Sequence, residues 1–215
     1  MKKKIIVFDF DKTLTYKDTL IGFYIFVSNK NFLFILKMLI YLFYMILAKV
    51  KFVSNDKLKN KGVHLFLKGK DIIKLKQKSV EYSENILLNK IYVNYDFNNL
   101  NEKIIIVSAS FQDYIYPLFP QNVKVIGSKL KIKDNKVIHL DFNCYSERKV
   151  EILMKKGLLE IDVLYTDSIS DLPLANISKK IILVKKDMKK IFFSIEKFKL
   201  HLKKCIFCNI KNVKL

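Results

Sequence analysis

The sequence feature that most constrains the fold is a series of short apolar runs separated by segments with helical periodicity. Runs of this length, without alternating polar residues, are typical of strands buried on both faces of a parallel sheet. Their alternation with helical segments predicts an α/β fold with a central parallel sheet. We expect its strands at Ile5–Phe8, Ile104–Val107, Val123–Ile126, Val163–Tyr165 and Ile181–Val184.

Turn signals and periodicity add a hairpin and several helices to this core. Leu130–Ile132 and Val137–Leu140 flank Asp134-Asn135, a pair that favours a tight β-turn. The helices expected between and after the strands are Phe111–Phe119, Ser146–Lys156, Ile169–Ile177 and an amphipathic Phe192–Leu202.

Three of the expected strands end in polar residues that are far apart in the sequence. Asp9, Ser108 and Asp167 each follow a buried run directly or within two residues. Ligands of parallel α/β sheets bind at the carboxyl ends of the strands, so we expect these side chains to share a site.

The pair Asp9 and Asp11 has the chemistry of a phosphoryl-transfer site. A carboxylate can attack phosphorus and form an aspartyl-phosphate. A second carboxyl two residues later can protonate the leaving oxygen and then deprotonate water. Strand alternation would point both side chains to one face. A lone pair of this kind is common in proteins, so the remaining residues of the set must support it.

The other candidates would hold a cation and the phosphoryl group. Asp167 adds a carboxylate suited to Mg²⁺, and Asp171 lies four residues later at an expected helix start. Ser108 offers a hydroxyl and Lys149 a positive charge. Each also has a plain structural explanation: Ser108 as a helix cap, the aspartates as loop residues, and Lys149 as one of many lysines.

The ordered set resembles a known family. "DFDKTLT", "IIIVSAS", a helical lysine in "SERKVEIL" and "YTDSISDLPL" resemble the four motifs of the haloacid dehalogenase (HAD) superfamily, over most of residues 3 to 185. The helical insertion after the first motif resembles the C1 cap of subfamily IB, which contains enzymes like phosphoserine phosphatase and phosphatidylglycerophosphatase C. The resemblance implies a Rossmann-like core and an Mg²⁺-dependent phosphatase.

The resemblance also implies roles. Asp9 would be the nucleophile and a metal ligand, Asp11 the acid/base with its main-chain carbonyl on Mg²⁺, and Asp167 a further ligand. Thr13 would support the first loop, and Asp171 would lie beside the metal site. The phosphate would be bound by Ser108, Ala109 and Lys149, which we prefer to Arg148. Lys12 and Thr166 stand where many relatives have Gly, so the shape of those loops is an open question.

The domain organisation follows from the position of the helical insertion. Residues 1–17 and 101–215 would form the catalytic core, and residues 18–100 a helical cap. Helices are expected there at Leu20–Ser28, Phe32–Val50, Asp56–Leu67 and Asp71–Leu88.

The apolar segment Phe32–Ala48 has three interpretations. It lacks an amphipathic stripe, which favours burial in protein or lipid. Its 17 residues reach about 26 Å as a helix, slightly less than the ~30 Å of a bilayer core. A single crossing would also separate Asp9 from Ser108. An internal cap core or a helix dipping into one leaflet therefore fits better than a full span.

Charge and cysteine content limit the partners. The net charge is +20, with 40 Lys and Arg residues of which only Arg148 is Arg. Nucleic-acid readers usually use Arg, so we expect no nucleic-acid partner, whereas dispersed Lys suits a solvated surface or an anionic membrane. No secretory signal precedes the first strand, and we expect a cytoplasmic protein. The pair Cys205 and Cys208 is weak evidence for zinc.

The sequence thus predicts a phosphomonoester hydrolase acting on a lipid-linked or membrane-proximal substrate. The cap contains no Arg to bind a substrate carboxylate, which disfavours phosphoserine. The alternatives are a phosphatase for a small soluble phosphometabolite, a phosphotransferase or mutase of the same superfamily, and a non-catalytic membrane-associated binding protein.

Overall fold

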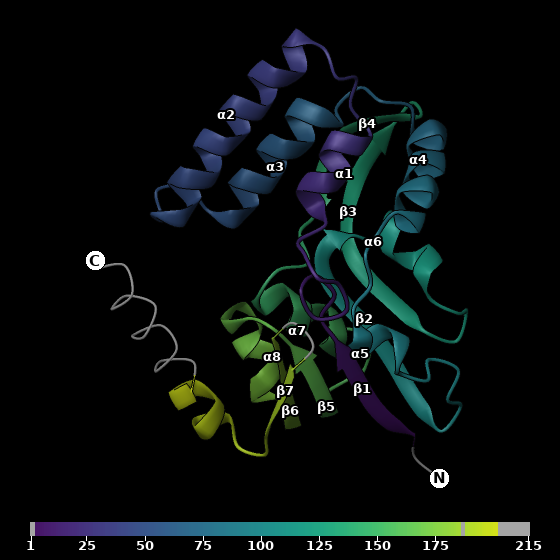
Figure 1. Cartoon of the computed structure of the whole chain (residues 1–215), viewed down its shortest axis with the longest axis vertical. Coiled ribbons are helices and arrows are strands. Elements are labelled where there is room, and N and C mark those ends of the chain that lie inside the picture. The colour runs from purple at the N-terminus through teal and green to yellow at the C-terminus, as the bar shows by residue number, and fades with distance from the viewer. Residues whose placement is uncertain (1–2, 186–187, 202–215) are drawn as a thin grey trace.

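The computed structural model describes residues 3–185 and 188–201. Its centre is a seven-stranded sheet with the order β4-β3-β2-β1-β5-β6-β7 (Figure 1). The five central strands run parallel, and the two outer pairs, β3·β4 and β6·β7, are antiparallel. The predicted α/β fold with a mainly parallel sheet is confirmed. The strands are β1 Lys4–Phe8, β2 Glu102–Phe111, β3 Lys124–Lys133, β4 Lys136–Phe142, β5 Ile161–Thr166, β6 Ser178–Lys185 and β7 Met188–Phe192.

Helices lie on both faces of the sheet and in a separate group above it. They are α1 Leu20–Phe26, α2 Phe32–Lys49, α3 Asn55–Phe66, α4 Ile72–Glu84, α5 Lys90–Val93, α6 Gln112–Ile115, α7 Glu147–Met154 and α8 Leu172–Asn176, with short 3₁₀ turns at Tyr116–Leu118 and Ile169–Asp171. All strands expected from the sequence occur. Apolar residues on the two faces of the sheet form two separate clusters of buried side chains.

Two segments differ from the prediction. Residues 111–119 form only short turns, because β2 continues to Phe111 and Pro117 lies in the following 3₁₀ turn. In the predicted helix 192–202, Phe192 instead ends strand β7, and residues 195–201 are helical. Edge strand β7 pairs with β6 through a lysine-rich sequence that lacks the apolar run of a central strand. Cys205 and Cys208 lie outside the described residues.

The β3–β4 hairpin joins the sheet to the helical group. Its turn residues Asp134 and Asn135 both have positive φ, as in a type I′ turn, which confirms the predicted hairpin. The hairpin exchanges backbone hydrogen bonds with the loop between α3 and α4: Gly69 N–H donates to Val137 C=O at 2.8 Å, and Val137 N–H donates to Lys70 C=O at 3.0 Å. These bonds fix that loop to the core sheet.

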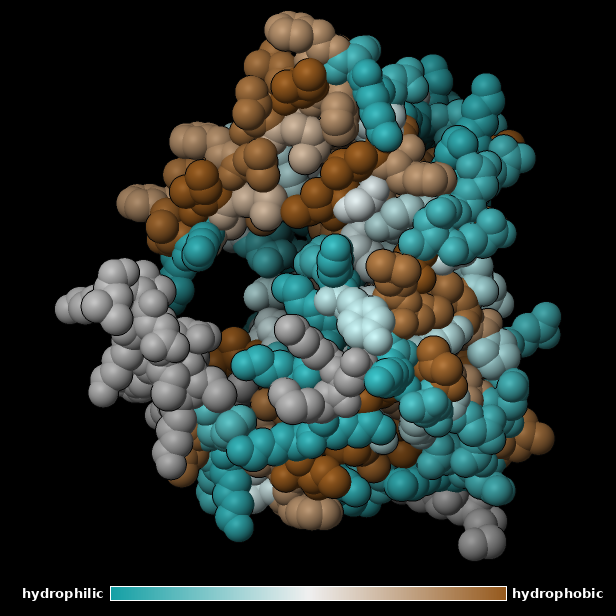
Figure 2. All heavy atoms as spheres, viewed as in Figure 1, coloured by the Kyte–Doolittle hydropathy of each residue, from teal (hydrophilic) through white to brown (hydrophobic). Residues whose placement is uncertain are grey.

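Helix α2 has two apolar faces with different surroundings. One face packs on α1 and α3 through Phe34, Met38, Tyr41 and Met45, of which only Tyr41 is fully buried. The opposite face is exposed and continues the same helical spacing; it contains Phe32, Leu33, Ile35, Leu36, Leu39, Leu42, Phe43 and Ile46. We call these eight residues the outer face of α2, and Figure 2 shows apolar side chains over this helix. The interpretation of Phe32–Ala48 as an internal cap core is therefore wrong.

A single membrane crossing by α2 is incompatible with the sheet. Among the described helices, α2 is the one that is long and apolar enough to cross a bilayer. However, β1 precedes α2 and β2 follows it, and these two strands pair along their whole overlap, for example Val7 with Ile105. Because both ends of α2 must return to the same sheet, one crossing would place paired strands on opposite sides of the membrane.

Candidate active site

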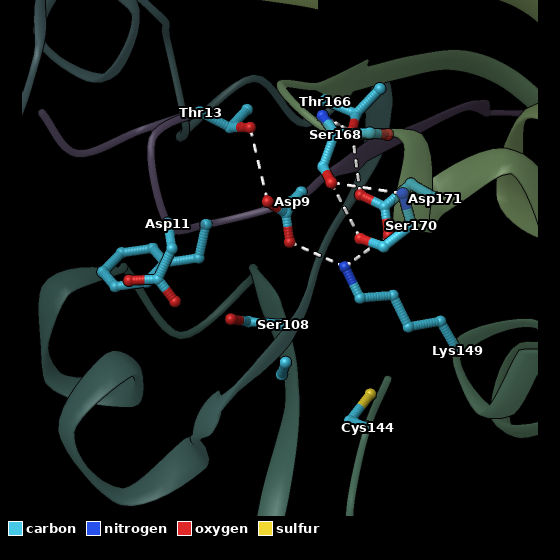
Figure 3. Close-up of polar contacts among 12 residues, drawn as sticks. Asp9, Asp11, Thr13, Ser108, Cys144, Lys149, Thr166, Ser168, Ser170 and Asp171 are labelled. Carbon is cyan, nitrogen blue, oxygen red and sulfur yellow. Dashed lines mark hydrogen bonds and ion pairs between the residues drawn. The ribbon is translucent and has the colours of Figure 1, made fainter. Parts of the chain in front are cut away.

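The polar ends of β1 and β5 meet at a buried group of three charges. Asp9 directly follows β1, and its N–H donates to Tyr165 C=O at 2.9 Å, which sets it beside the end of β5. Lys149 Nζ lies 2.7 Å from Asp9 Oδ1 and 2.7 Å from Asp171 Oδ1 (Figure 3). All three side chains are buried. Residues separated by up to 162 positions thus form one ion-paired cluster.

The protonation of this cluster follows from burial and charge. Burial raises the pKa of Asp9 to about 8, against the opposing charge of Lys149. Burial also lowers the pKa of Lys149, but Asp171 and Asp9 outweigh it and hold that pKa above its ordinary value. Lys149 is therefore a permanent cation at neutral pH. As expected, it faces inward, whereas Arg148 faces the cap and pairs with Asp56 at 3.0 Å.

Asp11 is held by hydrogen bonds from the start of the cap and the end of β2. Its Oδ1 accepts from Thr19 N–H at 2.7 Å and from Thr19 Oγ1 at 2.6 Å, and its Oδ2 accepts from Ser110 Oγ at 2.5 Å. Burial, followed by the charge of Asp18, raises the pKa of Asp11. A carboxyl that is fixed in place and shifted toward its protonated form suits a general acid.

The segment after "IIIV" carries Ser108 and Ala109. Ser108 is fully buried, and its Oγ accepts from Ser110 N–H at 3.0 Å, so its own proton remains available to a ligand. The Ala109 carbonyl accepts hydrogen bonds from Ser128 Oγ at 2.6 Å and from Lys59 Nζ. This carbonyl therefore faces the cap and β3.

Lys59 is a buried cation that the sequence prediction missed. It comes from cap helix α3 and also donates to Ser128 Oγ at 2.8 Å and Asn143 Oδ1 at 3.1 Å. None of its hydrogen-bond acceptors within the described part of the chain is a carboxylate. Burial lowers its pKa to about 8. Among so many lysines, only the tertiary structure distinguishes this one.

The first-motif loop accommodates a lysine in place of glycine. Lys12 has φ 60°, in the left-handed region that favours glycine. Its N–H donates to Thr15 Oγ1 at 3.0 Å, and Thr13 Oγ1 donates to Asp9 Oδ2 at 3.4 Å. The loop thus keeps a glycine-like backbone, and Thr13, which was expected to support this loop, contacts Asp9 from within it.

Thr166 also has a structural role at a position where glycine was the expectation. Its Oγ1 donates to Asp171 Oδ2 at 2.8 Å and accepts from Ser168 N–H at 3.1 Å. The two oxygens of Asp171 are therefore directed to Thr166 and Lys149. The roles of Thr19 and Ser110 were missed, and Thr166 was noted only for the shape of its loop, because a hydroxyl residue gives no sequence signal until its partner is known.

The carboxylates fit a hard divalent cation. In the described residues, no three Asp, Glu, His or Cys side chains form a ready-made metal cluster. Asp9 and Asp167 nevertheless repel each other, and burial, followed by the charge of Asp171, raises the pKa of Asp167 to about 6. Asp9 and Asp167 thus have too little positive charge around them, and carboxylate oxygens are the donors that Mg²⁺ uses together with phosphate and water.

Comparison with known proteins assigns the chain to a family. The family of haloacid dehalogenase-like hydrolases matches residues 6–176, which is most of the chain. The chain therefore belongs to this family. The predictions of the superfamily, of the fold and of a hydrolase are confirmed. None of the curated proteins compared matches the sequence.

Solved structures share the fold at low sequence identity. A protein of unknown function from Bordetella pertussis Tohama I has a TM-score of 0.67 at 16% identity, covering 82% of this chain and 87% of that one. A phospho-aspartyl intermediate analogue of phosphoserine phosphatase has a TM-score of 0.58 at 21% identity, covering 85% and 87%. Cytosolic 5′-nucleotidase IIIB bound to cytidine has a TM-score of 0.61 at 18% identity, covering 81% and 69%.

Proposed function

We propose that this chain hydrolyses phosphomonoesters through a phospho-Asp9 intermediate, with Mg²⁺ as cofactor. The observation that carries the proposal is the buried ion-paired cluster, in which Lys149 fixes Asp9 while Asp11 is held separately by Thr19 and Ser110. Asp9 is oriented by a permanent cation, as a nucleophile requires, although its raised pKa means that further positive charge is needed to keep it ionised. The raised pKa of Asp11 suits a general acid. The solved phosphoserine phosphatase of similar fold supports the same chemistry.

The residues divide the reaction into two steps. In the first, an Asp9 oxygen forms a bond to phosphorus while the bond to the leaving oxygen breaks, and Asp11 gives its proton to that oxygen. In the second, Asp11 takes a proton from water, and the water oxygen displaces Asp9 from phosphorus. The products are the free alcohol and inorganic phosphate. Ser108 and Lys149 would stabilise the phosphoryl oxygens in both steps.

Asp9, Asp167 and the Asp11 carbonyl would hold the metal. Bound Mg²⁺ would supply positive charge that keeps the two carboxylates ionised and neutralises the phosphate. Asp171 is directed to Lys149 and Thr166, so we propose that it positions the lysine from beside the metal site.

The test is a panel of phosphomonoesters that includes phospholipid phosphates, assayed with and without Mg²⁺. Asp9→Asn should lower turnover at least about a thousandfold, because amide oxygen is a poor nucleophile. Circular dichroism would show whether the variant still folds. Unchanged activity in Asp9→Asn would contradict the proposal and favour a non-catalytic binding protein. An alcohol acceptor added to the assay would reveal phosphotransfer in place of hydrolysis.

We further propose that the substrate is lipid-linked or membrane-proximal, at the cytoplasmic face of a membrane. The outer face of α2 exposes a continuous apolar stripe, with Phe32 83% and Ile46 62% exposed. Lys30 and Lys49 flank the helix in a chain of net charge +20. An exposed apolar stripe with lysines at both ends favours insertion into one leaflet of an anionic bilayer. A phosphatase for a soluble phosphometabolite would not require this surface.

Vesicle flotation tests the membrane contact. Leu39→Gln combined with Phe43→Gln removes two apolar side chains from the outer face of α2. This variant should bind anionic vesicles at least about tenfold more weakly than the wild type, because burying each side chain contributes roughly 1–3 kcal/mol. The matched control is Leu100→Gln with Leu159→Gln, two exposed leucines outside α2. Equal binding by both variants would contradict the proposed contact.

A further inference from the structure

A cavity of about 390 Å³ lies beside the N-terminal end of α2. It is lined by the α1–α2 loop, the first turns of α2, the end of α3 and the α3–α4 loop, and it is open to solvent on one side. Its charged lining residues are Lys37, Lys68 and Lys70, joined by His64, and no acidic residue lines it. The cavity is separate from the catalytic residues, and nothing in the proposed reaction uses it.

The positive charge of this cavity is not neutralised by the protein. Within the described residues, the ammonium groups of Lys37, Lys68 and Lys70 make no ion pair and no hydrogen bond. Burial and then the nearby charge of Lys37 lower the pKa of Lys70, so the two cations repel each other. An anion bound between them would remove this repulsion.

The lysines are held by ordered backbone. The α3–α4 loop is fixed to β4 by the hydrogen bonds of Gly69 and Lys70 with Val137. Asn31 caps α2 by accepting from Phe34 N–H at 2.9 Å, so the positive end of an 18-residue helix also borders the cavity. Little ordering would be needed when an anion binds, which favours affinity.

The position of the cavity identifies the source of the anion. The outer face of α2 begins at the same end, with Phe32 and Leu33 exposed beside the cavity residues. An apolar stripe next to a cationic cavity matches the two parts of an amphiphile, acyl chains and an anionic headgroup. We propose that the cavity binds the phosphate headgroup of an anionic phospholipid while the outer face of α2 contacts its acyl chains. This inference rests on the proposed membrane contact.

The first test compares two triple variants of equal charge by flotation with vesicles containing phosphatidic acid. Lys37→Gln/Lys68→Gln/Lys70→Gln should lower vesicle binding at least about tenfold more than Lys90→Gln/Lys103→Gln/Lys155→Gln, which removes three exposed lysines that do not line the cavity. Equal losses would mean that only general charge attraction acts, and would overturn the proposal.

The second test uses histidine as a reporter. His64 lines the cavity, and His139 lies on the exposed β4 strand. Short-chain soluble phosphatidic acid should shift the NMR signal of the His64 imidazole in the full chain and leave His139 unchanged. An equal response of His64 to inorganic phosphate at the same concentration would assign the cavity to a free anion, contrary to the proposal. If neither histidine responds, the proposal is also contradicted.

Activity separates this proposal from the proposed function. The cavity triple variant should hydrolyse a soluble phosphomonoester at the wild-type rate. If the wild type hydrolyses this substrate but floats with no vesicle, the membrane contact fails and the phosphatase stands. If the wild type and the cavity variant float equally, the cavity proposal alone fails.

Discussion

At the scale of single residues, the site depends on charges that are buried with partners. Lys149 has two carboxylates at 2.7 Å, whereas the acceptors of Lys59 are a carbonyl, a hydroxyl and an amide. A buried ammonium surrounded only by neutral acceptors is costly to charge. The difference between these two lysines has a measurable consequence for stability.

The stability contributed at Lys59 should increase with pH. Its pKa is about 8 in the folded protein against 10.5 ordinarily, so the unfolded chain binds the proton more tightly. The free energy of unfolding of the wild type should therefore rise relative to Lys59→Met between pH 8 and 10.5, by on the order of 3 kcal/mol. Urea denaturation at several pH values measures this, with Lys57→Met as a control on the same helix. A constant difference would contradict the expectation.

Tyr24 is the second residue whose burial has a testable cost in the free energy of folding. Its hydroxyl is buried and has no hydrogen-bond partner among the described residues. Tyr24→Phe should raise the free energy of unfolding by about 1 kcal/mol, since the desolvated hydroxyl is removed while the ring stays packed. Tyr114→Phe is the matched control. The Tyr114 hydroxyl lies 3.0 Å from Thr19 Oγ1, so its loss should destabilise the protein. Chemical denaturation of both variants shows whether each change raises or lowers the free energy of unfolding.

At the scale of elements, the close approach of β3 to the segment after Ser108 depends on one glycine. A Cβ on Gly127 would lie 2.7 Å from the Ser110 carbonyl oxygen and 2.7 Å from the Gln112 nitrogen, both backbone atoms. Gly127→Ala should therefore displace the segment that holds Asp11 through Ser110. We expect a loss of about 1–3 kcal/mol of stability together with reduced phosphatase activity.

The control for Gly127→Ala is Lys131→Ala, an exposed position of the same strand. This change should alter stability by less than about 0.5 kcal/mol. Thermal unfolding and hydrolysis of a soluble phosphomonoester are measured together. If Gly127→Ala keeps both properties of the wild type, the close approach has no role in ordering the site.

Helix α2 shows how an element can mislead sequence analysis. Its composition is apolar on all sides, which predicts burial in protein or lipid. Only the packing of α1 and α3 divides it into an inner face around Tyr41 and the exposed outer face. Periodicity could not make this division, because both faces consist of apolar residues.

At the scale of the whole molecule, the proposed metal site should link Mg²⁺ to stability. Asp9 follows β1 and Asp167 follows β5, so the two carboxylates meet only when the sheet is formed. Mg²⁺ at ten times its Kd should raise the melting temperature by roughly 3–6 °C, because it binds the folded chain alone. Asp167→Asn should lose most of this increase. A melting temperature that does not respond to Mg²⁺ or to a chelator would contradict the proposed site.

Part of this protein is determined by its sequence alone. The short apolar runs define the strands of a parallel sheet, because few other structures bury such runs. Asp9, Asp11, Lys149 and Asp171 could be selected because they lie in four motifs whose order along the chain resembles that of the HAD superfamily. The Asp134-Asn135 turn could be predicted because both residues tolerate positive φ.

The tertiary structure decided the rest. Lys59 became part of the site only through its contacts with β3 and the Asn143 segment, and the cationic cavity only through the meeting of three loops and helix ends. The physical reason is that a lysine has the same local preferences whether it is solvated, buried or facing other cations. Its environment is set by residues distant in the sequence, and no local pattern records which of them will surround it.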